Sequence, residues 1–237
     1  MADVRPKLMF GRRILILAPH PDDEVVCCAA AIGRARTGGA DIRVLHLTTG
    51  VPEAAAFWPW QRPGHAARVA RRRAEAERAA GTLGIAVAGF GDIASRCLRR
   101  HLHATRAAVA AAIDAFEADA LWVPAFEGAH QDHDAANAVA ATLAGRVAVT
   151  EFAAYRLAPD GPRSQDFAEP GPDAVTLDLT ADERAAKRAA LALYASEHGN
   201  LGHIAAAREA ARPLPAHDYA RPPHPGRLFW TRFQWVP

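Results

Sequence analysis

Short apolar runs alternate along the chain with longer segments that mix apolar and polar residues. RRILILA, at 12–18, is too short for a helix and fits a strand that is buried on both faces. Residues 23–39 follow and predict a helix that ends at Gly38 and Gly39. A second strand is expected at 41–49, so the chain opens with a strand–helix–strand unit whose strands run parallel.

The same alternation continues through most of the chain. It predicts further helices at about 66–83, 99–117, 129–145 and 181–196. It predicts further strands at 85–90, 120–126, 146–157 and 175–179. Residues 50–66 hold three prolines, two glycines and two tryptophans, which is typical of an irregular loop. A loop of this length is uncommon unless it has a function.

Strands that alternate with helices predict an α/β fold. We expect a Rossmann-like three-layer sandwich, with a mostly parallel central sheet and helices on both faces. Half of the 237 residues are hydrophobic and 23% are charged, as in a soluble globular protein. With no repeat or linker in view, we expect a single domain over residues 1–237. Its proline- and aromatic-rich end, at about 212–237, is expected to wrap onto the rest.

Charge and cysteine content restrict the partners and the location that we expect. The formal net charge of +2 is too small to indicate that the whole molecule attracts nucleic acid or an anionic membrane. Local basic patches are still compatible with this charge. No apolar stretch approaches the roughly 20 residues of a membrane span, and the N-terminus lacks a signal-peptide pattern. Three cysteines, two of them adjacent, do not make a disulfide framework. We expect a cytoplasmic protein, and its oligomeric state stays open, a homo-oligomer included.

Two polar clusters follow predicted strands directly. APHPDDE, at 18–24, follows the first strand, and EGAHQDHD, at 127–134, follows the strand at 120–126. Ligands of an open α/β sheet bind outside the carboxyl ends of its strands, so both clusters are expected at the binding edge. Carboxylates there would repel the phosphates of a dinucleotide. A serine hydrolase is disfavoured too, because no serine of the chain lies in a GxSxG motif.

The spacing within the clusters suits a metal site. His20 and Asp23 are three residues apart, as are His130 and His133, so each pair can converge on one point. Imidazole and carboxylate groups suit zinc, which in catalytic sites keeps three protein ligands and a water. The alternative is that Asp22 or Asp23 only caps a helix. Several unpaired carboxylates at the end of a buried strand would be costly without a cation, which favours the metal site.

HPDDE after a first strand, together with a later HxDH, resembles the PIG-L/LmbE-like family of metal-dependent de-N-acetylases. Residues 71–84, RRRAEAERAAGTLG, resemble the arginine-led helix of that family, and 189–196, AALALYAS, resemble a late helix. The resemblance implies an enzyme that removes the acetyl group from an N-acetylglucosaminide, a small-molecule amino-sugar conjugate.

The resemblance also implies roles for single residues. The implied zinc ligands are His20, Asp23 and His133, although spacing alone does not tell which aspartate binds the metal. Asp22 is then the general base. His130 becomes the charged partner of the tetrahedral intermediate and the acid, with Asp132 orienting it. Fe²⁺ stays an alternative metal.

The sequence departs from the family pattern at two positions. Gly128 stands where some relatives have a tyrosine, and Gln131 stands where proline is common. A contribution of that tyrosine to stabilising the oxyanion is therefore not carried over to this chain.

Four more residues are candidates for substrate binding. Arg72 matches a family arginine that faces the substrate, although a solvated arginine-rich helix face is an equal alternative. Trp58 and Trp60 could stack on a sugar ring or aglycone, or could anchor their loop to the core. Glu127 is expected to line the same pocket.

Two rival functions stay open. Two histidines and one carboxylate also describe the site of non-haem iron enzymes. A catalytically silent sugar-binding protein on the same scaffold is the other, although every expected catalytic position is filled.

Overall fold

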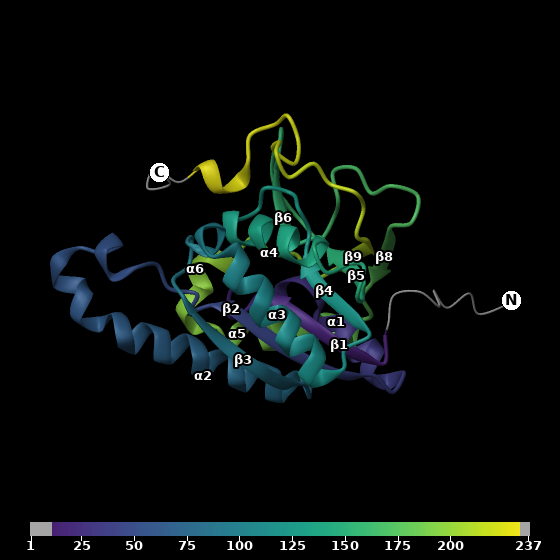
Figure 1. Cartoon of the computed structure of the whole chain (residues 1–237), viewed down its shortest axis with the longest axis horizontal. Helices are drawn as coiled ribbons and strands as arrows, with labels where there is room; N and C mark the ends of the chain where they lie inside the picture. Colours follow the sequence, from purple (N-terminus) through teal and green to yellow (C-terminus); the bar gives the residue numbers. More distant parts are fainter. Residues whose placement is uncertain (1–10, 233–237) are drawn as a thin grey trace, which may run out of the picture.

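The apolar runs of the sequence form one seven-stranded sheet in the computed structural model, which describes residues 11–232 (Figure 1). Its strands are β1 (Arg13–Ala18), β2 (Asp41–Thr48), β3 (Ala86–Ile93), β4 (Ala120–Pro124), β5 (Ala148–Phe152), β8 (Val175–Asp178) and β9 (Arg208–Pro213). A separate hairpin consists of β6 (Tyr155–Ala158) and β7 (Gly161–Ser164). The helices are α1 (Asp23–Thr37), α2 (His65–Leu83), α3 (Leu102–Phe116), α4 (Gln131–Ala141), α5 (Ala181–Ala192) and α6 (His198–Leu201).

The strand order is β3-β2-β1-β4-β5-β9-β8. The first five strands in this order run parallel, whereas β9 is antiparallel to both of its neighbours. The order reverses between β1 and β4, since the chain first builds outward from β1 on one side and then on the other. Open α/β sheets bind their ligands at such a reversal.

Alternate residues of β1 point to two separate cores. Ile14 and Ile16 pack with α1 on one face, and Leu15 and Leu17 pack with α3 and α4 on the other. Both faces of a parallel strand are therefore buried, as its continuous aliphatic run predicts. Figure 1 shows α3 and α4 in front of the sheet and α1 and α5 behind it. The prediction of a mostly parallel three-layer α/β sandwich is confirmed.

Two strand predictions differ from the structure. The single strand expected at 146–157 is divided, because β5 ends at Phe152 and β6 leaves the main sheet to pair with β7. Strand β9 was not predicted. Its sequence, REAARP, contains charged residues and ends in proline, yet Glu209 at its second position is completely buried.

Glu209 is buried because helix α1 is broken near its middle. Cys28 has φ −146° and ψ 27°, so the helical hydrogen-bond ladder is interrupted there. The freed amides of Ala30 and Ala31 donate to the Glu209 carboxylate, at 3.0 and 2.9 Å. A side chain from β9 thereby caps the second half of α1.

Lys187 of α5 completes this buried network. Its Nζ donates to Glu209 at 2.8 Å, to Gln165 Oε1 at 3.0 Å and to the carbonyl of Val26 at 2.9 Å. The ion pair therefore contacts α1 on both sides of the break. Lys187 of α5 thus holds the first half of the helix, which begins within the APHPDDE cluster, and Glu209 of β9 holds the second half.

The chain after β9 lies against the sheet and α4. Tyr219 Oη donates to Asn137 Oδ1 at 2.6 Å, and the amide of Phe229 donates to the carbonyl of Gly128 at 2.9 Å. Residues 233–237 of the segment expected to wrap onto the domain lie outside the described residues. No helix of the described part of the chain is long and apolar enough to span a membrane.

Replacing Glu209 by alanine is expected to lower the free energy of unfolding by about 3–5 kcal/mol, since Lys187 would stay buried without its partner. Urea denaturation measures this change. Glu77→Ala, on the exposed face of α2, is the matched control and is expected to stay within about 0.5 kcal/mol of the parent. Equal effects of the two substitutions would contradict a stabilising role of the network.

Candidate metal centre and active site

The two polar clusters meet at the reversal of strand order. Strands β1 and β4 are parallel neighbours, with Ile16 opposite Trp122. Their carboxyl ends therefore lie at the same edge of the sheet. The turn from β1 into α1 brings His20 and Asp22 there, and the turn from β4 into α4 brings His130.

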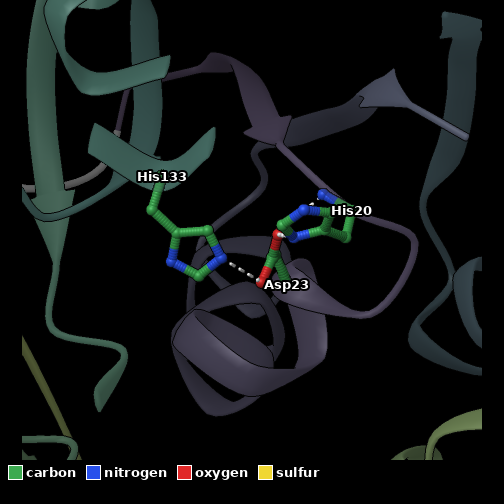
Figure 2. A group of neighbouring side chains, drawn as sticks. All are labelled: His20, Asp23 and His133. Atoms are coloured by element: carbon green, nitrogen blue, oxygen red, sulfur yellow. Dashed lines mark hydrogen bonds and ion pairs between the residues drawn. The ribbon is translucent and has the colours of Figure 1, made fainter. Parts of the chain in front are cut away.

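His20, Asp23 and His133 form a compact buried group (Figure 2). Their donor atoms all lie within 4.8 Å of one another. Asp23 Oδ1 is 3.0 Å from His133 Nε2, and Asp23 Oδ2 is 3.2 Å from His20 Nδ1. Two ligands of a tetrahedral zinc ion are about 3.4 Å apart, so the spacing of these atoms fits a zinc site.

His133 supports a metal site independently of the distances. Its side chain is fully buried, its Nε2 faces Asp23 alone, and its Nδ1 makes no hydrogen bond within the described residues. Buried polar atoms are nearly always hydrogen-bonded. A nitrogen that lies beside a carboxylate without such a bond is suited to bind a cation, and the donor set of this group fits one.

The electrostatics of the group also favour a cation. Burial opposes charge on His20, but hydrogen bonds with Asp132 and Asp23 outweigh it and raise the pKa of His20 to about 10. Burial acts to raise the pKa of Asp23, but His133 and His20 hold it well below its usual value. A metal ion would take the place of the proton on His20, since histidine binds metals in its neutral form.

Asp22 turns away from Asp23 although the two are adjacent. Its φ of 146° is unusual for any residue except glycine, and its side chain makes no hydrogen bond that caps α1. The alternative that Asp22 only caps the helix is therefore wrong. Asp22 Oδ2 instead accepts from Arg72 Nη2 at 3.2 Å. Burial raises the pKa of Asp22 to about 7, and the charge of Arg72 opposes that increase.

Arg72 is buried between two carboxylates. Only 3% of it is exposed, and its Nη1 lies 3.0 Å from Glu197 Oε1 while Nη2 contacts Asp22. The alternative of a solvated helix face is therefore wrong for Arg72. Burial would lower its pKa, but Asp22 and Glu197 raise it, so the guanidinium stays charged.

Asp132 and His130 are arranged differently from the expectation. Asp132 Oδ2 lies 3.1 Å from His20 Nε2 but 3.8 Å from His130 Nδ1. His130 Nδ1 accepts the backbone amide of Asp132 at 3.0 Å, so the proton of a neutral His130 ring lies on Nε2. Burial and the charge of His20 lower the pKa of His130 well below its usual value. Burial and the pairing of Asp132 with His20 thus disfavour the charged form of His130, and its role as the charged partner of the intermediate stays a prediction.

Asp132 belongs to a second group of side chains that could bind a metal ion. His20, His130 and Asp132 form another group whose donor atoms lie within 4.8 Å of one another. His20 belongs to both groups. The first group is the better metal site, because the carboxylate of Asp132 already accepts the backbone amide of Leu98 at 3.1 Å and that of Arg96.

A cavity of about 560 Å³ opens beside these side chains. His20, Asp22, Asp23, Arg72 and His130 line it on the side of the sheet. Tyr155, His203, Phe229 and Arg232, which lie outside the main sheet, line it as well. A volume of this size accommodates a small ligand of one or two rings.

Sequence reasoning missed two tyrosines of this region. Tyr155 lies with its ring centre 5.6 Å from that of His133. Tyr194 donates a hydrogen bond to Glu24, whose pKa burial raises to about 8. In the sequence, Glu24 stands out only as a residue of the predicted helix at 23–39. The segment AALALYAS includes Tyr194. Its contact with Glu24 could not be predicted, because no sequence pattern connects two residues that lie 170 positions apart.

The structure explains the glycine at position 128. Gly128 has φ +69°, and a Cβ atom there would lie 2.6 Å from Leu228 Cδ2. The segment that ends at Phe229 therefore occupies the space into which a side chain at this position would extend.

The other predicted substrate-binding residues lie outside the cavity. Trp58 is 65% exposed and Trp60 is 73% exposed, so neither anchors its loop to the core. Glu127 is buried, accepts the amide of Ala154 at 2.6 Å, and lines a separate cavity of about 660 Å³ beside Phe167 and His217. Contact of these three residues with a substrate stays a prediction.

An open α/β sheet with a histidine–carboxylate cluster at its reversal point defines a candidate metalloenzyme. Residues 15–144 match the model of the PIG-L family, described as GlcNAc-PI de-N-acetylase. This match covers more than half of the chain, which therefore belongs to the PIG-L family. A search of curated proteins found no match.

Solved structures show the same fold at low sequence identity. A deacetylase of teicoplanin biosynthesis has a TM-score of 0.66 at 18% identity, over 85% of this chain and 97% of that one. The N,N'-diacetylchitobiose deacetylase of Pyrococcus horikoshii has a TM-score of 0.58 at 16% identity, over 80% and 72%. A 4-carboxy-2-hydroxymuconate hydratase of Pseudomonas putida has a TM-score of 0.56 at 18% identity, over 88% and 98%. The fold alone therefore does not decide the reaction.

Gly50 restricts the position of Arg72. Gly50 has φ +68°, and a Cβ atom there would lie 2.7 Å from Pro21 Cδ and 2.8 Å from Arg72 Nε. The backbone after β2 thus approaches the Asp22–Arg72 pair more closely than any other residue type would allow.

Gly50→Ala is expected to lower the free energy of unfolding. A left-handed backbone costs a non-glycine residue roughly 1–2 kcal/mol, and the loss is expected to exceed this value because Arg72 must also move. Thermal or urea unfolding measures it. Gly81→Ala is the matched control, since nothing lies within 4 Å of its Cβ position on α2, and it is expected to stabilise by about 0.5–1 kcal/mol. A neutral Gly50→Ala would contradict the close approach.

Proposed function

We propose that the protein is a zinc-dependent de-N-acetylase that hydrolyses the acetamide of an N-acetylglucosaminide-type conjugate. The observation that carries the proposal is the opposite orientation of two adjacent aspartates. Asp23 faces two histidines and Asp22 faces the cavity beside Arg72. One turn of chain therefore supplies both a metal ligand and a base.

His20, Asp23 and His133 would hold the zinc ion. When bound, zinc polarises the amide carbonyl and lowers the pKa of water toward about 7. Asp22 accepts a proton from the attacking water, and its pKa of about 7 suits a general base at neutral pH. Arg72 holds the Asp22 carboxylate in place through their 3.2 Å contact.

His130 assists on the other side of the scissile bond. Its Nε2 hydrogen can bond to the carbonyl oxygen as that atom gains negative charge. The bond between the carbonyl carbon and nitrogen then breaks, the nitrogen receives the proton that Asp22 accepted from the water, and acetate and a free amine leave. His130 acts as an acid towards the oxyanion, to which it donates its Nε2 hydrogen bond. Asp132 acts through His20 in this arrangement, which it contacts at 3.1 Å.

The family description and the deacetylases with the same fold support this substrate class. The cavity of about 560 Å³ has room for one sugar ring and part of an aglycone. A cytoplasmic location and a homo-oligomeric state stay predictions.

Asp22→Asn is expected to lower kcat by about 10²–10⁴, because the amide cannot accept the proton of the attacking water. Its bound metal, measured by elemental analysis, is expected to stay at the parental level, since Asp23 and both histidines are unchanged. Near-normal turnover of this variant would show that the base is a different group.

His133→Ala is expected to lose both bound metal and turnover, because it removes one of three protein ligands. His103→Ala is the matched control, since His103 is exposed on α3 and is expected to keep metal and activity. Full metal occupancy of His133→Ala would favour the second group, His20, His130 and Asp132, as the metal site.

Acetate release from a panel of N-acetylglucosaminides tests the reaction itself. Chelator-treated protein is expected to be inactive and to recover with Zn²⁺ under anaerobic conditions. Recovery with Fe²⁺ alone and consumption of oxygen would favour the non-haem iron class. Saturable sugar binding without acetate release under either metal would favour a silent binding protein.

A further inference from the structure

The loop at residues 51–64, here called the tryptophan loop, projects from the body of the protein next to the start of α2 (Figure 1). It contains two short 3-10 helices, η1 (Ala54–Ala56) and η2 (Pro59–Gly64). Trp58 and Trp60 are 65% and 73% exposed. Within the described residues the only other exposed large hydrophobic side chain is Leu102, at 41%. Two neighbouring exposed tryptophans on a projection indicate an interaction surface.

The tryptophan loop is held in one conformation by its own side chains and by those at the start of α2. Arg62 Nε donates to the carbonyl of Phe57 at 3.1 Å, and Arg68 Nη1 donates to that of Gln61 at 2.8 Å. His65 Nε2 lies 2.8 Å from the carbonyl of Pro52. The two indole rings are stacked, with centroids 5.3 Å apart and planes 4° from parallel. The tip is thus preorganised, which reduces the entropy lost on binding.

Apart from Glu53 at the start of the loop, the charge around the tip has one sign. Residues 54–74 contain five arginines and no acidic residue. Arg72 is buried, while Arg71 pairs with Glu75 at 3.0 Å and Arg73 pairs with Asp92 at 2.6 Å. Arg62 and Arg68, which are nearest to the tip, have no carboxylate partner in the part of the chain that the structure describes. Their charge is uncompensated beside the tryptophans.

We propose that the tryptophan loop docks the protein on an anionic lipid surface. Indole rings are favoured at the boundary between headgroups and acyl chains, and arginine next to them is attracted to anionic headgroups. A symmetric contact between two copies of the loop would instead bring Arg62 and Arg68 near their own counterparts, where like charges repel. The charge pattern therefore favours lipid over a second copy.

Docking through this loop has a consequence for the active site. The loop starts at the rim of the cavity, because Gly50 and Pro52 both line it. A protein held at the tip keeps the cavity close to the lipid surface. The proposal concerns binding and does not depend on the proposed reaction, since it is tested without turnover.

Co-sedimentation of the full chain with vesicles tests the proposal. Binding is expected to vesicles of equal parts phosphatidylglycerol and phosphatidylcholine, and to be much weaker with phosphatidylcholine alone. Raising NaCl from 0.1 M to 1 M shortens the Debye length from about 10 Å to about 3 Å and is expected to weaken binding. The double variant Trp58→Ser/Trp60→Ser is expected to bind about tenfold more weakly or worse. Leu102→Ser, which changes the other exposed hydrophobic residue, is expected to bind like the parent.

Three results would overturn the proposal. The first is equal binding of the double variant and the parent, with thermal unfolding confirming that both are folded. The second is a parent dimer, measured by light scattering, that the double variant loses, because the tip would then contact a second copy. The third is a double variant whose KM for a water-soluble N-acetylglucosaminide is raised while its vesicle binding equals that of the parent, because the tryptophans would then contact substrate.

Discussion

Three consecutive carboxylic acids, Asp22, Asp23 and Glu24, are buried at the end of one strand, and the site depends on keeping their charges apart. Each has a different partner: Asp22 contacts Arg72, Asp23 contacts two histidines, and Glu24 accepts from Tyr194. Like charges this close in a poorly solvated site would otherwise repel strongly. Those partners come from α2, from the first turn of α4 and from the chain around Tyr194.

The parts of the fold that follow a local pattern could be predicted from the sequence alone. The run ILIL of β1 and the clusters HPDDE and HQDHD each contain their signal within a few residues. Strand β9 and the partner of Glu24 have no such local signal. Glu209 reads as a surface residue until Lys187, the Cys28 break and the free amides of α1 are known together. Partnerships across long separations depend on tertiary packing, which a single sequence does not display.

Adjacent residues of the same type have different environments in the structure. Arg71, Arg72 and Arg73 are consecutive, yet only Arg72 is buried and faces Asp22. The direction of each follows from the 100° turn per residue of a helix packed on one side. Proteins at 16–18% identity share the fold, although two are named as deacetylases and one as a hydratase. Side-chain orientation is therefore more informative about the chemistry than the fold.

Part of the cavity wall comes from the last described segment of the chain rather than from the sheet. Leu228 covers Gly128, and Phe229 and Arg232 line the cavity. A wall on a segment outside the sheet can change in length and composition during evolution without disturbing the strands that position the reactive groups. Substrate range and catalytic chemistry can thus diverge independently within one lineage, since they are encoded in separate stretches of the gene.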